Sequence, residues 1–310
     1  MKRDALVALV LFALVALVPM AGEAYWLRLG TTMLMYGVFA MSWNFIGGMA
    51  GYPSFAVAAF FGLGAYTGAV AQKFDLPLGL AWGLAGLAAL VFAGLLGIAL
   101  LRLRGHYFAI ASLVVAEVLR ELVNSATDLT GGGMGLNLPV PRMASVDVQA
   151  AFFFYAMLGL AAVTFAAMLV THYSRLGFGL RCIQQNEPAA DMLGVDTTSY
   201  KVAAFMLSGV FVGMAGAIYA SWVHYIEPPD VFDVLYSVKA IVMVLLGGAG
   251  SVFGPLLGAA VFLSLEELVW REFLQFHTGV LGLLIVLLVM FLPRGLLALS
   301  ARLPWSRTKP

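Results

Sequence analysis

Charged side chains within long apolar runs are the residues of this sequence that could do chemistry. Glu117, Arg120 and Glu121 lie in one such run at i, i+3 and i+4 spacing, so Glu117 can face both of the others on one helix surface. A charge at the centre of a bilayer costs roughly 2.5–3.5 kcal/mol on insertion scales, which makes this group a candidate for a translocation path. The same spacing suits a mutually neutralising group near the outer end of a membrane span, and we favour this structural interpretation.

Three further polar side chains lie in or beside apolar runs. Glu266 and Glu267 are adjacent, and Arg271 follows Glu267 by four residues, which predicts a structural pair near the outer interface. Asn44 lies toward the end of an earlier run, where an amide more often bonds across helices than binds a ligand. A translocation-path role for Asn44 stays open beside this structural one.

No arrangement of residues predicts a catalytic or cofactor site. The glycine clusters at residues 131–135 and 247–254 lack the Lys-Ser/Thr pair of a nucleotide-binding P-loop. A single cysteine, Cys182, excludes an intramolecular disulfide and a multi-cysteine metal site. Metal-ligand spacing is also absent from the four histidines, His106, His172, His224 and His277. We therefore expect no catalytic residue, no metal and no cofactor bound by this chain.

The composition places these residues in a membrane. Hydrophobic residues make up 62% of the 310 residues and charged residues 11%, against about 25% charged in a typical soluble domain. So few polar residues cannot coat a globule of this length, and lipid must cover most of its surface. The net charge of +1 gives no reason to expect nucleic acid as a partner. We predict an all-α polytopic membrane protein with a single transmembrane domain, residues 1–310.

Apolar windows of the ~17–25 residues that cross a bilayer recur along the chain. They predict about ten spans, at residues 5–20, 25–45, 54–71, 78–101, 106–123, 150–171, 202–223, 237–246, 252–268 and 278–292. The first resembles a signal peptide, but its apolar run is long and more spans follow at once, so we favour an uncleaved span. Glycines separate the eighth span from the ninth, which predicts either a tight helical hairpin or a broken helix lining a cavity.

The distribution of basic residues predicts the orientation of these spans. By the positive-inside rule, loops rich in Lys and Arg face the cytoplasm. Ten spans place these residues on that side: Lys2, Arg3, Arg102, Arg104, Arg175, Arg181, Arg294, Arg302, Arg307 and Lys309. Three of the loops predicted on the other side, at residues 72–77, 124–149 and around 227–233, contain only two basic residues, Lys73 and Arg142. Both termini and the polar stretch 174–201 are therefore predicted to be cytoplasmic.

That polar stretch predicts two short helices with a joint between them. Residues 176–185 can form the first helix. Asn186 can then cap the second, with Glu187 in its first turn, where a carboxylate suits the helix dipole. Gly194 is placed to end the second helix in a left-handed conformation. A folded element of this kind between two spans can dock onto something outside the membrane.

Two glycine-rich breaks, at residues 47–51 and 247–250, resemble each other and are both predicted at the cytoplasmic side between two spans. An internal repeat, which is a common build for transporters, would explain the likeness. Coincidence in a chain with 34 glycines explains it equally well.

Motifs along nearly the whole chain resemble one family. They are Gly51-Tyr52-Pro53-Ser54-Phe55, Phe60-Phe61-Gly62-Leu63-Gly64-Ala65-Tyr66, Arg104-Gly105-His106-Tyr107-Phe108, Thr130-Gly131-Gly132, Ser174-Arg175-Leu176-Gly177 and Gly247-Gly248. The chain resembles the LivM-like inner-membrane permease subunit of branched-chain amino acid ABC importers. This resemblance implies that the polar stretch is a cytoplasmic coupling loop that docks onto a separate ATPase subunit. The matching positions are Arg181, Asn186, Glu187, Ala189, Ala190 and Gly194. Gln184-Gln185 and Pro188 depart from the family pattern.

The resemblance also implies the partners and the location. We expect a second, related permease subunit, two ATP-binding-cassette subunits that bind and hydrolyse ATP, and a periplasmic protein that delivers the substrate. All of these would assemble at the bacterial inner membrane, with this chain spanning the lipid bilayer.

Several functions remain open at this point. The first is translocation of branched-chain, hydrophobic amino acids, and the second is the same transport with urea or short amides as cargo. A polytopic membrane enzyme is a third, with Glu117, Glu121, Glu266 and Glu267 as acid/base or metal-binding groups. A proton-coupled carrier is a fourth, but it would leave the polar stretch unexplained. We favour the ABC permease.

Overall fold

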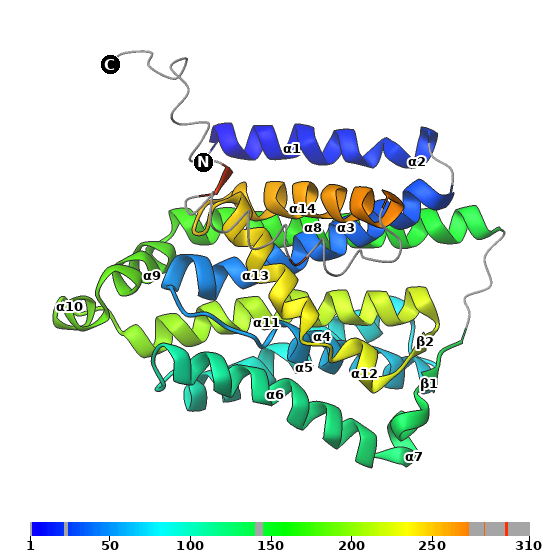
Figure 1. Cartoon of the computed structure of the whole chain (residues 1–310), viewed down its shortest axis with the longest axis horizontal. Coiled ribbons are helices and arrows are strands. Elements are labelled where there is room, and N and C mark those ends of the chain that lie inside the picture. The colour runs from blue at the N-terminus through cyan, green and yellow to red at the C-terminus, as the bar shows by residue number, and fades with distance from the viewer. Residues whose placement is uncertain (1, 22–23, 140–144, 273–281, 283–294, 297–310) are drawn as a thin grey trace.

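The computed structural model describes residues 2–21, 24–139, 145–272, 282 and 295–296, and helices make up most of this part of the chain (Figure 1). The long helices are α1 (Lys2–Ala16), α3 (Ala24–Trp43), α4 (Val57–Lys73), α5 (Leu78–Leu100), α6 (His106–Ser125), α8 (Val146–Tyr173), α11 (Thr197–Val223), α13 (Leu235–Gly247) and α14 (Gly254–Glu272). The short elements are α2 (Val18–Ala21), the π-helical turn η1 (Asn44–Gly48), α7 (Thr127–Thr130), the 3-10 turn η2 (Gly132–Met134), β1 (Leu136–Asn137), α9 (Arg175–Gln185), α10 (Glu187–Met192), β2 (Tyr225–Ile226) and α12 (Pro228–Val231).

A helix lies at each predicted span that falls among the described residues, while the predicted span 278–292 lies outside them apart from residue 282. Three of these helices, α5, α8 and α11, are long and apolar enough to cross a membrane by length and composition alone, with mean hydropathies of 2.3, 2.1 and 1.9. By contrast, α13 has 13 residues, about 20 Å of helix. The helical class is thus confirmed, and the number of spans stays a prediction.

The core of one half of the bundle is α11, which packs between α4 and α5. Small residues let these helices approach closely. A Cβ atom added to Gly64 would lie 2.0 Å from the carbonyl oxygen of Gly213, and one added to Gly216 would lie 2.2 Å from that of Phe61. Because lipid tails are as apolar as leucine, membrane helices associate through such close packing more than through the hydrophobic effect.

The other half of the bundle is built on α3, which packs against α8, α13 and α14. Helix α1 lies along the outside of α8, and the Tyr173 hydroxyl at the end of α8 donates a 2.6 Å hydrogen bond to Asp4. The glycine break at residues 247–250 is the turn between α13 and α14, which pack against each other (Figure 1). Of the two structures open to this break, the helical hairpin is the one formed.

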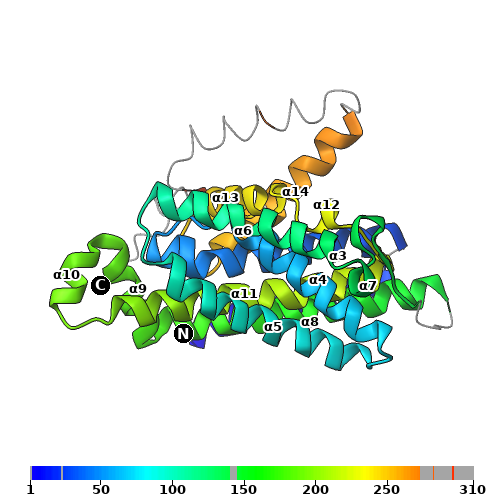
Figure 2. The ribbon, with the colours of Figure 1, turned by 90° about the horizontal axis from the view of Figure 1, so that it is seen from below.

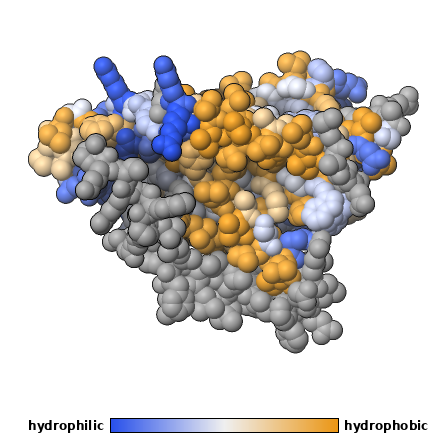
Figure 3. Space-filling model, turned by 90° about the horizontal axis from the view of Figure 1, so that it is seen from above, coloured by the Kyte–Doolittle hydropathy of each residue, from blue (hydrophilic) through white to orange (hydrophobic). Residues whose placement is uncertain are grey.

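The two ends of the bundle differ in structure (Figures 1 and 2). Helices α9 and α10 project at one end. At the opposite end, β1 and β2 form a two-residue antiparallel ladder that pairs Leu136 with Ile226 and Asn137 with Tyr225. This ladder was not predicted by the all-α class. Between the ends, hydrophobic side chains cover the middle of the face drawn in Figure 3, and hydrophilic ones lie mainly toward its ends. An apolar belt between polar ends suits a protein surrounded by lipid.

The glycine packing of α11 against α4 gives a test of the fold. Gly216→Ala places a methyl group against the backbone of α4, and overpacking of this kind costs about 1–3 kcal/mol. We expect the thermal unfolding temperature of the purified, lipid-embedded protein to fall. Gly83→Ala on exposed α5 is the control, because nothing lies within 4 Å of its added Cβ atom. This control should leave the protein unchanged or slightly more stable, and equal losses in both variants would contradict the packing described.

Candidate functional site

The candidate site is the connection formed by α9 and α10, which confirms the predicted pair of short helices. Ser174 caps α9, and its side chain accepts a hydrogen bond from the backbone N–H of Gly177. Asn186 forms the joint, because its side-chain oxygen accepts a 3.1 Å hydrogen bond from the N–H of Ala189 in the first turn of α10. Asparagine and serine are among the residues that best satisfy the free N–H groups at a helix start.

The end of α10 also follows the prediction. Gly194 adopts a left-handed backbone with φ of +84°, a conformation that costs glycine little. Its N–H bonds the carbonyl of Asp191 at 2.9 Å, and the N–H of Val195 bonds that of Ala190 at 3.1 Å. This pair of bonds is the Schellman motif, which satisfies the last carbonyls of a helix. Helix α10 therefore has well-defined ends despite its six residues.

Apolar side chains are exposed at the tip of this connection. Met192 is 83% exposed and Leu193 82%, and Phe178 on α9 is 65% exposed. Helix α10 lies at the extreme end of the molecule in both ribbon views (Figures 1 and 2). Exposed apolar side chains at a projecting tip mark a surface that can bury area against a protein partner.

Glu187, in contrast, points into the protein. Its Oε1 atom lies 2.7 Å from the Nζ atom of Lys201, which is only 4% exposed, and its Oε2 atom accepts a 2.5 Å hydrogen bond from the Tyr52 hydroxyl. Lys201 donates two further bonds, to the Tyr52 hydroxyl at 3.1 Å and to the carbonyl of Leu101 at 3.0 Å. All three N–H donors of the ammonium group therefore have acceptors. We call Tyr52, Glu187 and Lys201 the anchor cluster.

The anchor cluster holds Glu187 ionised. Burial acts to raise the pKa of the Glu187 carboxyl, but hydrogen bonds from Lys201 and Tyr52, with the positive charges of Lys201 and Arg104, lower this pKa below its ordinary value. Arg104 is the more distant cation, with its Nε atom 3.8 Å from Glu187 and its side chain largely exposed. A buried ion pair with satisfied hydrogen bonds is costly to break, at about 3–5 kcal/mol when one partner is removed.

The anchor cluster ties α10 to three parts of the bundle. Tyr52 belongs to the break between η1 and α4, Leu101 follows α5, and Lys201 lies in the second turn of α11. A rigid-body movement of α10 must therefore carry these segments with it or break the ion pair.

Helix α9, which precedes α10, contacts the glycine break at residues 47–51. The side-chain amide of Gln184 on α9 donates a 3.0 Å hydrogen bond to the carbonyl of Gly48 in η1. Asn44, also in η1, is fully buried and joins this turn to the α13–α14 hairpin. Its side chain accepts a 2.8 Å bond from the N–H of Gly250 and donates a 3.0 Å bond to the carbonyl of Ser251. The two glycine breaks, which are 200 residues apart in sequence, are thus in direct contact at the base of α9.

The other residues selected from the sequence lie elsewhere. Arg181 donates to the carbonyl of His172 at 3.0 Å and so fastens α9 to the end of α8. On α6, Glu117 pairs with Arg120 at 2.6 Å, and both side chains are about 40% exposed. Glu121 is also exposed on that helix. This group lies on the surface of the bundle and is not brought to the α9–α10 connection.

Sequence reasoning did not find the anchor cluster. In the sequence, Lys201 is simply the last residue of the polar stretch 174–201, and Tyr52 is part of a family motif. A lone lysine near the start of a long apolar helix is a signal that could have been used, because such a charge needs a partner. Among the described residues no cluster of metal-ligating side chains occurs.

A helical bundle with an apolar surface is typical of a polytopic membrane protein. The family described as "Branched-chain amino acid transport system / permease component" matches residues 25–292, so the chain belongs to this family of transport permeases. The family likeness is therefore spread over most of the chain.

Individual relatives agree with this assignment. The chain is 29% identical to the high-affinity branched-chain amino acid transport system permease protein LivM of Salmonella typhimurium, over 88% of this chain and 70% of the relative. It is 28% identical to the permease protein LivH of Escherichia coli, over 44% of this chain and 45% of that one. The ribose import permease protein RbsC of Haemophilus influenzae is 27% identical, over 64% and 63% of the two chains. No solved structure matches the chain.

The anchor cluster predicts a non-additive response to mutation. Glu187→Ala leaves Lys201 as a buried charge without its main partner, and we expect a loss of about 3–5 kcal/mol in stability or detachment of α10. Adding Lys201→Ala removes that charge and should recover part of the loss. Hydrogen exchange of residues 186–196 and thermal unfolding measure both effects. Asp191→Ala is the control, since Asp191 is exposed on the same helix, and strictly additive losses would contradict the cluster.

Proposed function

We propose that this chain is the transmembrane permease subunit of an ATP-binding-cassette importer for branched-chain, hydrophobic amino acids. The observation that carries the proposal is the likeness to LivM, which extends over 88% of this chain and 70% of the relative. The likeness to the ribose permease covers a smaller share of both chains. Amino acids are therefore the cargo favoured over sugars, and urea or short amides stay the alternative cargo that the experiment below tests.

Basic residues support an inward orientation of the α10 end. Lys2, Arg3, Arg102, Arg104, Arg175 and Arg181 all belong to the start of α1, the α5–α6 connection or α9, at that end of the bundle (Figure 1). Acidic residues gather at the other end, in the β2–α13 region, with Glu227, Asp230 and Asp233. By the positive-inside rule, α9 and α10 would then face the cytoplasm of a bacterium and the β1–β2 ladder the periplasm, with about ten spans between them.

In this proposal a separate ATPase subunit docks on the tip of α10. Met192 and Leu193 supply exposed apolar area for that contact. Glu187 couples α10 to the bundle, because its ion pair with Lys201 makes α10 move with the bundle and the bundle move with α10. ATP is bound and hydrolysed on the partner subunits. Binding of ATP closes the two ATPase subunits, and the anchor cluster passes their movement to the break at Tyr52 and to α11.

The remaining partners follow from the importer class. The likeness to LivH, over 44% of this chain, supports a second permease subunit of related sequence. Two different permeases, two ATPase subunits and a periplasmic binding protein would then form the complete importer. The binding protein would deliver the amino acid at the β1–β2 end.

The test is ATP hydrolysis by the complete complex in lipid. It combines this chain with a related second permease, two ATPase subunits and a binding protein loaded with leucine, isoleucine, valine, urea or ribose. We expect stimulation by the binding protein that holds a branched-chain amino acid. Stimulation by urea or ribose instead would contradict the proposed cargo. Failure of the ATPase subunits to associate would contradict the proposed importer function.

The docking role of the α10 tip has a matched control on the same chain. Met192→Asp places a charge in the proposed interface and should reduce stimulated ATP hydrolysis at least tenfold, with unchanged thermal stability. Met134→Asp is the control for association of the ATPase subunits, measured without the binding protein, because Met134 is 85% exposed at the opposite end of the bundle, against 83% for Met192. Full stimulation of the Met192→Asp complex would contradict the proposed contact between α10 and the ATPase subunit.

A further inference from the structure

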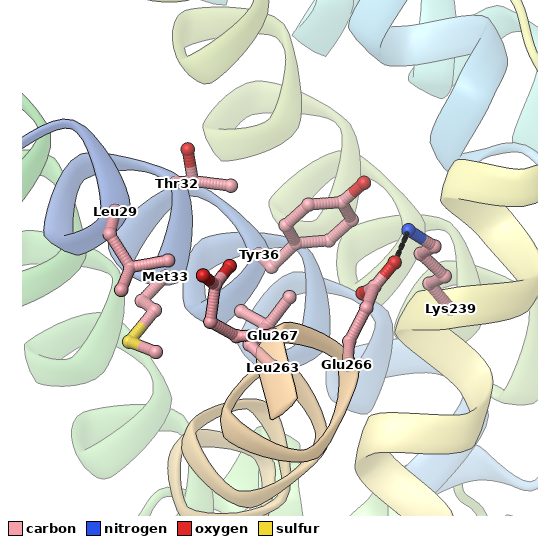
Figure 4. A pocket seen from close by; sticks show the side chains of 8 residues that line it. All are labelled: Leu29, Thr32, Met33, Tyr36, Lys239, Leu263, Glu266 and Glu267. Carbon is pink, nitrogen blue, oxygen red and sulfur yellow. Dashed lines mark hydrogen bonds and ion pairs between the residues drawn. The ribbon is translucent and has the colours of Figure 1, made fainter. Parts of the chain in front are cut away.

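A second pair of opposite charges lies partly buried in a cavity between α3, α13 and α14. Its volume is about 230 Å³, and its lining includes Leu29, Met33, Tyr36, Lys239, Leu263 and Glu266. Figure 4 shows Lys239 and Glu266 on one side of the cavity and Leu29 and Met33 on the other. These residues lie near the middle of α3 and in the halves of α13 and α14 farther from the glycine break.

The ion pair is close but incompletely satisfied. The Nζ atom of Lys239 lies 2.6 Å from Oε1 of Glu266, and both side chains are about 20% exposed. The second carboxylate oxygen of Glu266 is buried and has no hydrogen-bond donor among the described residues. Lys239 lies 5.3 Å from the centre of the Tyr36 ring, and no further hydrogen bond from its ammonium group is made within the described part of the chain.

Such a pair contributes little to folding stability. Removing two charges from water costs several kcal/mol for each ion, and their attraction repays this only when the remaining lone pairs and protons also find partners. The anchor cluster meets that condition, whereas Lys239 and Glu266 do not. Ionisable groups in a membrane domain that face a cavity are by default functional, and open hydrogen-bonding capacity on both members of the pair points to a ligand.

The chemistry of the cavity defines the ligand class. An ammonium and a carboxylate side by side can each bind the opposite charge of a zwitterion, and charge-assisted bonds of this kind are the strong ones. Leu29, Met33 and Leu263 provide an apolar wall for an aliphatic side chain. The cavity is below the ~300–1,000 Å³ of sites for drug-sized ligands, which suits a single amino acid.

We propose that this cavity is a binding site for a zwitterionic amino acid with an aliphatic side chain. Lys239 binds the ligand carboxylate, and Glu266 accepts from the ligand ammonium group. The proposal rests on the importer function proposed above, for which it supplies a substrate site within the membrane domain. Glu267 also lines the cavity and accepts a hydrogen bond from the Tyr25 hydroxyl, so it is already engaged at the rim.

The experiment is equilibrium binding of radiolabelled leucine to the full chain in lipid nanodiscs. Lys239→Met and Glu266→Gln should each weaken leucine binding at least tenfold. The double variant removes both charges together and so avoids leaving one unpaired, and it should also fail to bind while folding normally. Glu117→Gln, which breaks the ion pair on α6, is the matched control and should bind leucine as the unmodified protein does.

Single-charge analogues of leucine test the zwitterion itself. 4-Methylpentanoate lacks the ammonium group and 3-methylbutylamine lacks the carboxylate, so neither should displace leucine effectively. Displacement by the amine alone would make this a site for organic cations and overturn the proposal. Thr32→Trp fills the cavity without altering the ion pair and should abolish binding with unchanged thermal stability.

Failure of this site is distinguishable from failure of the importer function. If the unmodified chain does not bind leucine, or if the double variant binds it normally, the site is wrong. Leucine-dependent stimulation of ATP hydrolysis in the complete complex would still support the importer. If that complex does not respond to any amino acid while the nanodisc protein binds leucine through Lys239 and Glu266, the site stands and the importer function falls.

Discussion

The buried ion pair between Glu187 and Lys201 is the interaction on which the arrangement of the α10 end depends. Helix α10 is six residues long, too short to be stable alone, and its outer residues Met192 and Leu193 are exposed. What fixes its position is a carboxylate whose partner lies in α11, with further bonds from Tyr52. A charge pair of this kind allows few alternative positions, because any displacement leaves an ammonium group in a dry environment without an acceptor.

Close backbone contact extends this constraint into the bundle. Asn44 can bond both Gly250 and Ser251 only because the π-helical turn and the α13–α14 turn touch, and a Cβ atom on Gly48 would collide with the Asn44 side chain. Gln184 adds α9 to the same junction. The base of the α9–α10 connection is therefore a junction of irregular backbone, where polar groups that helices would satisfy are satisfied by side chains instead.

Local features of this fold were predictable from sequence, and distant pairings were not. Apolar runs located the described helices because a membrane span has a minimum length, and the ends of α10 followed from the capping chemistry of Asn186 and Gly194. The anchor cluster joins residues that are 14 to 149 positions apart, so no local pattern reports it. The sequence predicted a structural pair between Glu267 and Arg271 and gave no partner for Glu266, and the structure pairs Glu266 with Lys239 on α13.

Among the described residues, the ion pairs Glu187–Lys201 and Lys239–Glu266 differ in a way that separates a structural role from ligand binding. Lys201 uses all its donors, and both oxygens of Glu187 accept hydrogen bonds. The pair of Lys239 and Glu266 is equally short, yet one carboxylate oxygen has no donor within the described residues, and the pair borders a cavity. A buried acceptor without a hydrogen-bond donor lowers the free energy of unfolding of the protein. A ligand that donates a hydrogen bond to this acceptor removes the penalty when it binds. Such a site can therefore bind its ligand with few contacts.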